Sequence, residues 1–593
     1  MVASRQDGIG NVFGVSRSLG GRAWRWRASS NAIAAENGEE GLIDELLRAR
    51  GVAPHDVARH RNPTLRDFLP DPSIFNGMRD AAERIAHAVE HRQKVTIYGD
   101  YDVDGATSAA LLVRLLRALD LPADYYIPDR LLEGYGPSGK ALVELGSSGT
   151  DLVVTVDCGA MAFDALQQAC DAGVEVIVVD HHKCSSELPS CVALVNPNRL
   201  DESDEAASYG HLAAVGVAFL LAIEIVRTLR ERGWFEHRAE PSLIGLLDLV
   251  ALGTVADVAA LHGLNRAFVA QGLKVMARRG NTGMAALIDA SRLKRAPVCS
   301  DLGFALGPRI NAGGRVGEST LGVRLLTTSD SEEARIIANQ LSELNEDRRA
   351  IEAAVQEAAE AQVATQHNRA VLIAAGERWH PGVIGIVAGR IKEKYGRPAI
   401  VIALDGAEGK GSGRSISGVD LGAAIIAARG EGFLVAGGGH AMAAGMTITS
   451  DRVEAFGNWL EARLEADVAN ANATLTTVLD LSVAPSGLTP ELVSTLERAG
   501  PYGVGWPGPR VAVGPVRLVK ADVVGNGHVR IIAAGPDSAR FKGIGFRMAD
   551  SGLGQALLHA KTRPLWLAGR AKIDDWGVRP AAELHLEDAA WAD

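Results

Sequence analysis

The run Val178-Val179-Asp180-His181-His182 decides the fold, because it joins an apolar strand to one carboxylate and two imidazoles. Residues 174–179 form a short apolar stretch after Gly173, which predicts a buried strand of a parallel sheet. The polar side chains at its carboxyl end then lie where open α/β sheets bind their ligands.

Two other predicted strands end in the same way. Residues 95–98 run into Gly99-Asp100-Tyr101-Asp102-Val103-Asp104-Gly105, and residues 152–156 run into Asp157-Cys158-Gly159. Further strands are predicted at 123–127 and 192–195, separated by segments of helical periodicity. This alternation predicts an α/β fold with a parallel, doubly wound sheet. Three strand ends deliver acids and histidines to one edge.

These acids and histidines predict a metal site. Asp100, Asp102 and Asp104 stand two positions apart, and their carboxylates would repel one another without a cation. A solvated surface turn is the alternative for an isolated group of this kind. The acid and histidines at the ends of the neighbouring strands favour the metal site. Carboxylates with a minority of imidazoles suit manganese or magnesium, whereas structural zinc prefers thiolates or more histidines.

Length and composition indicate a multidomain protein of ordinary globular character. The chain has 593 residues, 47% hydrophobic and 22% charged, so domains of ~150 residues would number three or four. The net charge of -11 argues against nucleic-acid binding by bulk positive charge, but it does not exclude a local basic channel. Five cysteines without a Cys-x-x-Cys pair, and no apolar run of ~18 residues, predict a cytoplasmic protein without a membrane span.

Composition shifts divide the chain. Residues 331–366 nearly lack Gly and Pro and predict a long connector helix, and a second α/β region follows with Gly-rich turns. Short β-rich runs from about 474 onward predict a small β-barrel. The acidic end at 587–593 is expected to be solvated. The expected parts are an N-terminal arm and helices at 1–74, a catalytic domain at 75–330, the connector at 331–366, the second α/β domain at 367–472 and the barrel at 473–593.

Several residues are candidates for binding phosphate. Arg130 comes first and Arg309 and Arg315 next, because planar guanidinium groups suit phosphate oxygens, although each alone also fits a surface arginine. Ser412 and Arg414 stand in a Gly-flanked turn. The run 437–439 would expose backbone donors before His440 opens a predicted helix, which makes an anion cradle. A tight turn and a structural histidine are the alternatives.

The motifs carry a family resemblance. The sequences Gly99–Gly105, Val156-Asp157-Cys158-Gly159, Asp180-His181-His182 and Gly253-Thr254-Val255-Ala256-Asp257 resemble the four ordered motifs of the DHH phosphoesterase superfamily. Trp379-His380-Pro381-Gly382-Val383, Ser412-Gly413-Arg414-Ser415 and residues 438–445 resemble the DHH-associated domain, and residues 308–315, 344–349 and 501–505 complete the set. From about residue 75 to the end, the combination is similar to the RecJ family of exonucleases.

The resemblance implies roles for individual residues. It makes Asp257 a site residue, which spacing alone does not, and Asp100 a supporting or bridging partner. Two manganese or magnesium ions would share Asp157 and activate a water that attacks phosphorus, so no protein nucleophile is needed. Cys158, directly after Asp157, is a candidate nucleophile by its residue type, but a small buried side chain is expected because no base is implied beside it. The metal ligands implied are Asp102, Asp104, Asp157, His181, His182 and Asp257.

The function implied is a single-stranded-DNA-specific 5′→3′ exonuclease that releases 5′-mononucleotides in DNA repair and recombination. The barrel would be an OB-type domain that grips single strands, the protein is expected to be a monomer, and single-strand-binding protein and a helicase would be its partners. Trp506 stands where the family usually has Asn, either as a stacking platform or as packing. The alternatives are a phosphodiesterase of short oligoribonucleotides or cyclic dinucleotides, and a non-catalytic replisome factor.

Overall fold

The computed structural model describes residues 11–27, 38–130, 132–473, 475–560, 562–574 and 580–592. The chain forms two compact units, which are described separately below. One unit contains residues 63–350 and 501–507 and holds the parallel sheet. The other contains residues 1–62, 351–500 and 508–593 and holds the second α/β region and the barrel.

The parallel sheet of the first unit has five strands in the order β3-β2-β4-β5-β6. All neighbouring strands pair in parallel, as the sequence predicts for a doubly wound sheet. The order reverses between β2 and β4, which makes the edge beside their carboxyl ends the expected ligand site. The strands are β2 (Val95–Gly99), β3 (Ala123–Tyr126), β4 (Leu152–Val156), β5 (Glu175–Val179) and β6 (Ala193–Val195).

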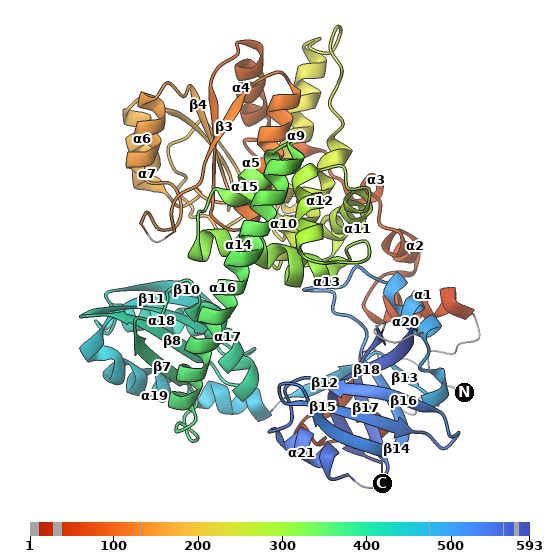
Figure 1. Ribbon diagram of the computed structural model, residues 1–593. Coiled ribbons are helices and arrows are strands. Elements are labelled where there is room, and N and C mark those ends of the chain that lie inside the picture. Colours follow the sequence, from red (N-terminus) through yellow and green to blue (C-terminus); the bar gives the residue numbers. More distant parts are fainter. Residues whose placement is uncertain are drawn as a thin grey trace. The chain divides into compact units, whose positions relative to one another are not determined.

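Helices cover both faces of this sheet, which explains why β2 and β4 are buried at every position (Figure 1). The apolar side chains of α4 (Met78–Glu90), α5 (Val103–Ala118), α9 (Ala214–Glu231) and α10 (Leu247–Ala256) share one core with one face. Those of α6 (Gly139–Ser147) and α7 (Phe163–Asp171) pack on the other face. The remaining helices of this unit are α3 (Leu65–Phe68), α8 (Asp204–Ala207), α11 (Gly263–Ala277), α12 (Thr282–Ala290), α13 (Cys299–Asp301), α14 (Gly307–Val316) and α15 (Leu321–Thr327).

The predicted connector is confirmed as one long helix, α16 (Ser331–Val363). It begins with Glu332 and Glu333 in its first turn, where negative side chains favour the helix dipole. Its first part packs in the core of the parallel-sheet unit through Ala334, Ile337 and Leu341. Its last part packs through Val355, Ala359 and Val363 in a core of the second α/β region.

The second α/β region contains a mixed sheet of order β10-β11-β9-β8-β7. The prediction of Gly-rich turns is wrong here: residues 411–413 lie within β9 and residues 437–439 within β10. His440 ends β10 and does not open a helix. Pairing of both strands with β11 outweighs the turn preference of glycine. The elements are β7 (Leu372–Glu377), α17 (Ile384–Tyr395), β8 (Ala399–Asp405), β9 (Glu408–Arg414), α18 (Leu421–Gly430), β10 (Ala436–His440), β11 (Ala443–Thr449) and α19 (Val453–Ala473).

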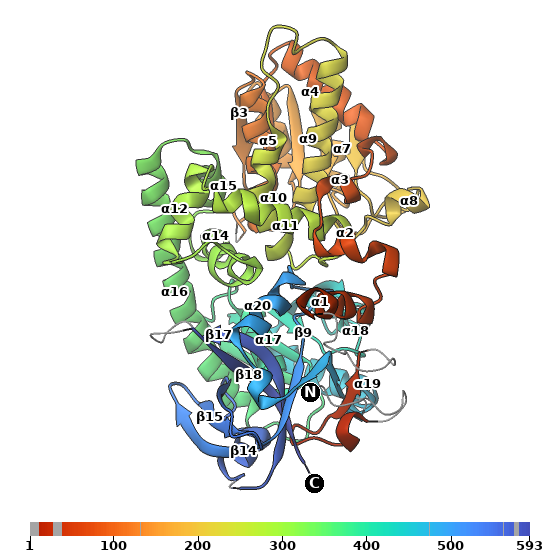
Figure 2. The same cartoon turned by 90° about the vertical axis from the view of Figure 1, so that its right-hand side faces the viewer.

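The predicted C-terminal barrel is confirmed as a closed barrel of five strands. The sheet runs in the order β14-β15-β16-β18-β17, and a further pairing of β14 with β17 closes it. Figure 2 shows strands of this barrel from a second direction. The elements here are β12 (Thr476–Leu479), β13 (Leu481–Val483), α20 (Pro490–Arg498), β14 (Val511–Val524), β15 (His528–Ala534), β16 (Arg540–Gly545), α21 (Gly552–Leu558), β17 (Leu565–Asp574) and β18 (Ala581–Trp591).

The N-terminal segment is part of the barrel unit. Strand β1 (Ala23–Trp26) pairs in parallel with β12, and Trp24 is fully buried. Helices α1 (Gly38–Ala49) and α2 (Val57–Arg61) follow it. The expectation of a solvated acidic end is wrong, because β18 continues to Trp591 and Asp588 is only 1% exposed. The indole Nε1 of Trp24 donates to Asp588 Oδ2 over 2.8 Å, so a buried donor compensates the buried charge.

Among the described residues, none of the helices is both long enough and apolar enough to cross a membrane. All five cysteines are free thiols, and Cys158 is buried, as predicted. Burial raises the pKa of the Cys158 thiol well above its ordinary value, and its Sγ lies 3.4 Å from the carbonyl oxygen of Val156. A thiol held neutral in this way is a poor nucleophile.

Candidate metal centre

The carboxyl ends of β2, β4 and β5 lie side by side, because these strands are neighbours in the sheet. The acids after β2, Asp157 after β4 and the Asp180-His181-His182 run after β5 therefore meet at one edge, as predicted. Asp100, Asp104, Asp157 and Asp180 are each at most 3% exposed. A buried carboxylate needs hydrogen-bond donors or cations around it, so the partners of each acid identify its task.

The turn after β2 uses its acids in different ways. Asp102 is the N-cap of α5, and its Oδ1 accepts from the amides of Asp104 and Gly105 at 2.8 and 3.1 Å. Asp104 therefore lies in the first turn of the helix. A Cβ on Gly105 would come within 2.4 Å of the carbonyl oxygen of Asp100. The turn can close only with glycine at this position.

Asp104 is held by the amino end of a second helix. Its Oδ2 accepts from the amide of Ala214 over 2.6 Å, and its Oδ1 accepts from that of Val215 over 2.9 Å. Both donors belong to the unpaired amides that begin α9, which favour a negative charge. The helix end therefore fixes the orientation of this carboxylate before any cation binds.

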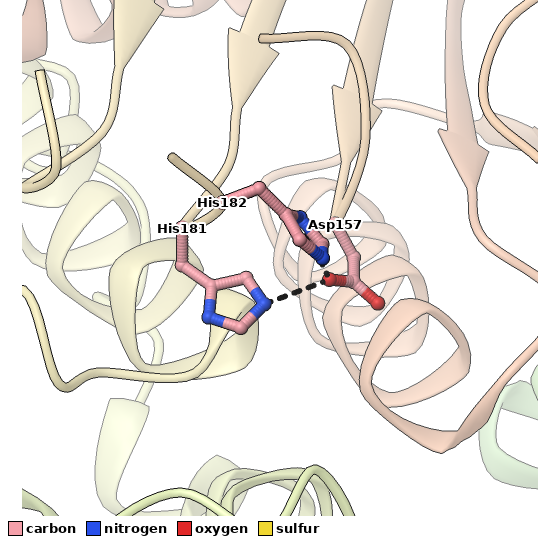
Figure 3. A group of neighbouring side chains, drawn as sticks. All are labelled: Asp157, His181 and His182. Atoms are coloured by element: carbon pink, nitrogen blue, oxygen red, sulfur yellow. Dashed lines mark ion pairs between the residues drawn. The ribbon is translucent and has the colours of Figure 1, made fainter. Parts of the chain in front are cut away.

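Asp157 lies at the centre of the group. Its backbone has φ of 62°, a left-handed conformation that non-glycine residues adopt rarely and often at functional sites. Its Oδ1 lies 3.2 Å from Nε2 of His181 and 4.0 Å from Nδ1 of His182. Figure 3 shows both imidazoles directed at this one carboxylate.

His181 presents Nε2 to the site because its other nitrogen is engaged. Nδ1 donates to the carbonyl oxygen of Leu212 over 3.0 Å. Burial lowers the pKa of His181, so the ring is neutral near pH 7, and its buried Nε2 has no hydrogen-bond partner among the described residues. An imidazole fixed through one nitrogen, with a lone pair on the other, is the usual arrangement of a metal ligand.

Asp180 supports both histidines, a role that sequence reasoning did not assign. Its Oδ1 accepts from the amides of His181 and His182 and from His182 Nδ1, the last over 2.7 Å. Its Oδ2 accepts from the amide of Ala160 over 2.9 Å. Despite burial, these bonds and the nearby His182 lower the pKa of Asp180 to about 2, and the pair raises the pKa of His182 to about 9. The position of Asp180 in the sequence, between the apolar strand and the two histidines, could have indicated this role.

Asp257 reaches the group through helix packing, although it lies far along the chain. Helix α10 packs against α5 and α9, and Asp257 is its C-cap. A Cβ on Gly253 would lie 2.3 Å from Thr107 Oγ1 and 3.0 Å from Asp104 Oδ1, so this approach requires glycine. Asp257 Oδ2 then lies 3.9 Å from Nδ1 of His181.

The carboxylates of the centre are crowded and buried, so they repel one another and their pKa values are raised. Burial and the charge of Asp102 raise the pKa of Asp104 to about 7. Burial and the charges of Asp104 and Asp102 raise the pKa of Asp257 to about 8. The pKa values of Asp100 and Asp157 are raised well above the ordinary value for the same reasons. A bound cation would reverse these shifts.

Three groups of side chains each offer ligand atoms within 4.8 Å of one another. Oxygen donors predominate, and the buried Oδ1 of Asp100 has no hydrogen-bond partner among the described residues. This donor set fits manganese or magnesium. The groups are Asp157, His181 and His182; Asp104, His181 and Asp257; and Asp100, Asp102 and Asp157.

Two of the predicted phosphate-binding arginines lie near the acids. The guanidinium carbon of Arg130 is 5.0 Å from the ring centre of Tyr101. Burial and the positive charges of Arg130 and Arg348 lower the pKa of Arg315 to about 10, so these arginines gather at one place. Arg309 is engaged elsewhere on α14, donating to Ser342 Oγ and to the carbonyl oxygen of Ala305.

The other phosphate candidates lie together in the second unit. Arg414 and His440 both stand opposite Ala443 on neighbouring strands, so they share one face of the sheet with Ser412. A Cβ on Gly385, in the first turn of α17, would lie 2.9 Å from Arg414 Nη2 and 3.0 Å from Ser412 Oγ. The predicted helix at His440 is absent, since that residue ends a strand, but the start of α17 lies beside the other two residues.

Tyr135 belongs to the centre and was not predicted. Its hydroxyl donates to the carbonyl oxygen of Asp157 over 3.1 Å and lies 3.2 Å from Nδ1 of His182. The side chain is 56% exposed. Its position in the Gly134-Tyr135-Gly136 run after Arg130 was the available signal.

Trp506 is a packing residue in this structure and not an exposed stacking platform. It is 7% exposed, and its ring lies 4.9 Å from the guanidinium carbon of Arg266. Arg266 is itself fully buried. The alternative that the sequence left open is therefore decided in favour of packing.

The fold and the centre are those of a DHH phosphoesterase. Three family models match in order: the DHH family N-terminal domain at residues 94–254, the DHHA1 domain at residues 368–466 and the RecJ OB domain at residues 479–588. The "single-stranded-DNA-specific exonuclease RecJ" of Dickeya dadantii is 40% identical over 83% of this chain and 86% of its own length. That of Escherichia coli is 37% identical over the same shares. The chain belongs to the RecJ family.

Solved structures agree with this assignment. RecJ from Thermus thermophilus in complex with Mn²⁺ matches with a TM-score of 0.73 and 29% sequence identity, over 92% of this chain and 77% of that chain. The same protein in complex with Mg²⁺ matches with a TM-score of 0.68 and 28% identity, over 93% of this chain and 76% of that chain. Both crystal structures hold a cation of the kind that the donor set here suits.

Proposed function

We propose that this protein is a metal-dependent exonuclease that degrades single-stranded DNA from its 5′ end to 5′-mononucleotides. The observation that carries the proposal is the meeting of carboxylates and histidines from three strand ends, in groups whose ligand atoms lie within 4.8 Å, in a chain of the RecJ family. The strand order supports it, because the centre lies at the reversal point of a parallel sheet.

Six residues are proposed to bind two manganese or magnesium ions. Bound cations would lower the pKa of a water and stabilise the charge that develops on the phosphoryl oxygens. The protein's own part is to hold the ligand atoms still: the start of α9 orients Asp104, and Leu212 orients His181. Asp100 completes the carboxylate group as a supporting partner. The ligands are Asp102, Asp104, Asp157, His181, His182 and Asp257.

The arginines are proposed to bind the phosphates of the strand. Arg130 and Arg315 bring positive charge close to the acids and would hold the phosphate next to the reacting one. Ser412, Arg414 and His440 would hold the terminal phosphate, and the position of the first turn of α17 beside Ser412 and Arg414 supports this role. Arg309, bonded to Ser342, is proposed to act on phosphate only after release from that contact.

The barrel is proposed to hold the strand beyond the reacting nucleotide, as OB-type domains do. Specificity for single strands would then depend on shape and on contacts with the backbone, not on base edges. We further propose that the protein is a cytoplasmic monomer and that it acts in DNA repair and recombination. Single-strand-binding protein and a helicase that opens DNA ends would be its partners.

A digestion assay tests the proposal. Two long single-stranded DNAs, one labelled at each end, and a blunt duplex are incubated with the protein and Mn²⁺, with Asp157→Asn as the matched inactive variant. We expect immediate release of labelled mononucleotide from the 5′-labelled single strand, late release from the 3′-labelled strand and none from the duplex. If long strands survive while di- to pentanucleotides disappear, the protein is a short-oligonucleotide phosphodiesterase. No hydrolysis with normal Mn²⁺ binding would indicate a non-catalytic role.

A further inference from the structure

A short segment before the barrel packs against the loop that follows Asp257. Residues 501–507 separate α20 from β14, yet they belong to the compact unit of the parallel sheet. We name residues 501–507 the strap and residues 258–262 the Asp257 loop. Since Asp257 is a proposed metal ligand, the strap contacts the segment that leaves the metal centre.

The strap is a closed turn that hydrogen-bonds to the Asp257 loop. The amide of Gly503 donates to the carbonyl oxygen of Trp506 over 3.0 Å, and the amide of Trp506 donates back to Gly503 over 3.2 Å. Between them, the carbonyl oxygen of Val504 accepts from the amide of Leu261 over 2.8 Å. This backbone bond joins the middle of the strap to the end of the Asp257 loop.

Two glycines of the strap permit this close approach. A Cβ on Gly503 would lie 2.6 Å from Cδ1 of Leu261. Gly505 has φ of +69°, and a Cβ there would lie 3.0 Å from Cβ of Ala260. Larger residues at these positions would separate the strap from the loop, so the two backbones are matched in shape.

Arg266 ties both ends of the strap to α11. Its side chain is fully buried, and its Nη1 donates to the carbonyl oxygen of Pro501 over 3.0 Å. Its guanidinium carbon also lies 4.9 Å from the ring centre of Trp506. A buried cation gains from both contacts, because the carbonyl oxygen and the aromatic face replace water.

The Asp257 loop contains a strained residue. Val258, which follows Asp257, has φ of 63°, and a β-branched residue is a clear outlier in this conformation. Its side chain is 60% exposed, so packing of that side chain does not explain the conformation. Strained residues persist where the surroundings hold them. The amides of Val258 and Ala259 donate to the carbonyl oxygens of Val255 and Thr254, each over 3.2 Å, which caps α10 at one end of the loop, and the strap holds the other end at Leu261.

We infer that the strap is a positioning element for the metal centre, with Arg266 and Trp506 as positioning residues for Asp257. The strap holds Leu261, which keeps the strained Val258 in its conformation and the Asp257 carboxylate 3.9 Å from His181. The inference rests on the proposed function, since it assigns Asp257 to a metal. Without the strap, the loop relaxes and cation binding must restore the strained conformation.

Mn²⁺ affinity of the full chain is the direct measurement, taken from the electron paramagnetic resonance signal of free Mn²⁺. We expect Trp506→Ala to weaken Mn²⁺ affinity on the order of tenfold, because cation binding must then restore the strained conformation of Val258. Gly503→Val places a side chain against Leu261 and displaces the strap, so it should weaken the affinity by a similar factor. Trp506→Phe keeps an aromatic face, and its Mn²⁺ affinity should stay near that of the unmodified protein. Trp459→Ala is the matched control, because Trp459 also packs against an arginine, Arg463, at 5.4 Å in the other unit.

Relief of strain gives a second, opposite test. Adding Val258→Gly to Trp506→Ala should restore Mn²⁺ affinity, because glycine adopts positive φ without strain and the exposed side chain leaves no cavity. Hydrogen exchange of the Leu261 amide should accelerate in Trp506→Ala and in Gly503→Val. If these variants lose amide protection yet bind Mn²⁺ like the unmodified protein, the inference is overturned. If the unmodified protein binds no Mn²⁺, the proposed metal centre itself fails.

Discussion

His181 donates from Nδ1 to the carbonyl oxygen of Leu212, and this 3.0 Å bond leaves Nε2 as the atom that faces Asp157. Leu212 lies two residues before the start of α9, whose first amides bind Asp104. One turn of chain therefore orients an imidazole through its carbonyl and a carboxylate through its amides. Ligands fixed in this way need little reorganisation when a cation binds.

Asp157→Asn should abolish hydrolysis while raising the stability of the metal-free protein. The change removes one charge from a buried group of repelling carboxylates and removes an oxygen that two metal ions would share. We expect a loss of at least ~10³-fold in kcat, typical for loss of a group that stabilises transition-state charge. Single-turnover assays and thermal melts in a chelator measure both effects. A lower melting temperature would contradict the repulsion argument.

Metal affinity should rise with pH and level off above about 8. The pKa values of Asp104 and Asp257 are raised to about 7 and about 8 by burial and by neighbouring carboxylates. Below these values the acids carry protons that a cation must displace. Calorimetry with Mn²⁺ between about pH 6 and 8.5, in buffers of different ionisation enthalpy, should detect proton release that declines at high pH. Equal affinity across this range would refute the assignment of these ligands.

Asp180→Asn should destabilise the metal-free fold and change its pH dependence. The pKa of Asp180 is lowered to about 2, so its stabilisation is present above the ordinary value of 3.8 and is lost as pH falls through 2. The pKa of His182 is raised to about 9, so that contribution is lost as pH rises through 9. The shift in the pKa of Asp180 corresponds to about 2 kcal/mol of stability, and we use it in preference to the His182 shift because His182 is partly exposed. Urea denaturation between about pH 2 and 9 should therefore show a lower free energy of unfolding for Asp180→Asn than for the unmodified protein in the middle of this range.

Arg315→Lys should weaken recognition of phosphate without slowing the chemical step. A lysine keeps the charge but loses the planar pair of donors, so we expect about a tenfold fall in kcat/KM with kcat little changed. Burial and the charges of Arg130 and Arg348 lower the pKa of Arg315, which means that a positive charge at this position does not stabilise the fold. The fold should therefore survive the change to lysine. Arg309→Lys on the same helix is the comparison. A larger effect from Arg309→Lys would reverse the proposed order of these two residues.

Trp24→Phe should release the N-terminal strand from the barrel. Phenylalanine keeps the aromatic bulk but cannot donate to the buried Oδ2 of Asp588. Leaving that carboxylate with one donor fewer should cost about 1–3 kcal/mol in the free energy of unfolding. Trp26→Phe is the control, since Trp26 is only half-buried. Similar costs for the two changes would show that the hydrogen bond is unimportant.

The parallel sheet and most of the centre could be predicted from the sequence because both follow local rules. A buried parallel strand is a short apolar run, and the residues directly after it lie at the ligand edge, as Asp157 and His181 do. Asp257 required the family resemblance, since the packing of α10 against α5 and α9, with Gly253 close to Asp104, brings this residue to the centre. No local pattern records such a contact.

The errors have the same origin. Residues 437–439 are all glycine, which favours a turn locally, but pairing with β11 makes them a strand. The charge of Asp588 favours a solvated end, although alternation of apolar and polar residues from Ala582 to Glu587 continues β18 and gives Asp588 a buried position. Its compensating donors, such as Trp24, come from the opposite end of the chain and are invisible in the local sequence.

The bond between Trp24 and Asp588 joins residues separated by 564 positions. On a ribosome that adds roughly 5–20 residues each second, Trp24 is made about half a minute to two minutes before its partner exists. During that time the first strand has no barrel to join, and its indole has no buried site. Strand β1 is therefore made well before the strand that completes its native surroundings, and the nascent chain must stay free of aggregation until β18 emerges.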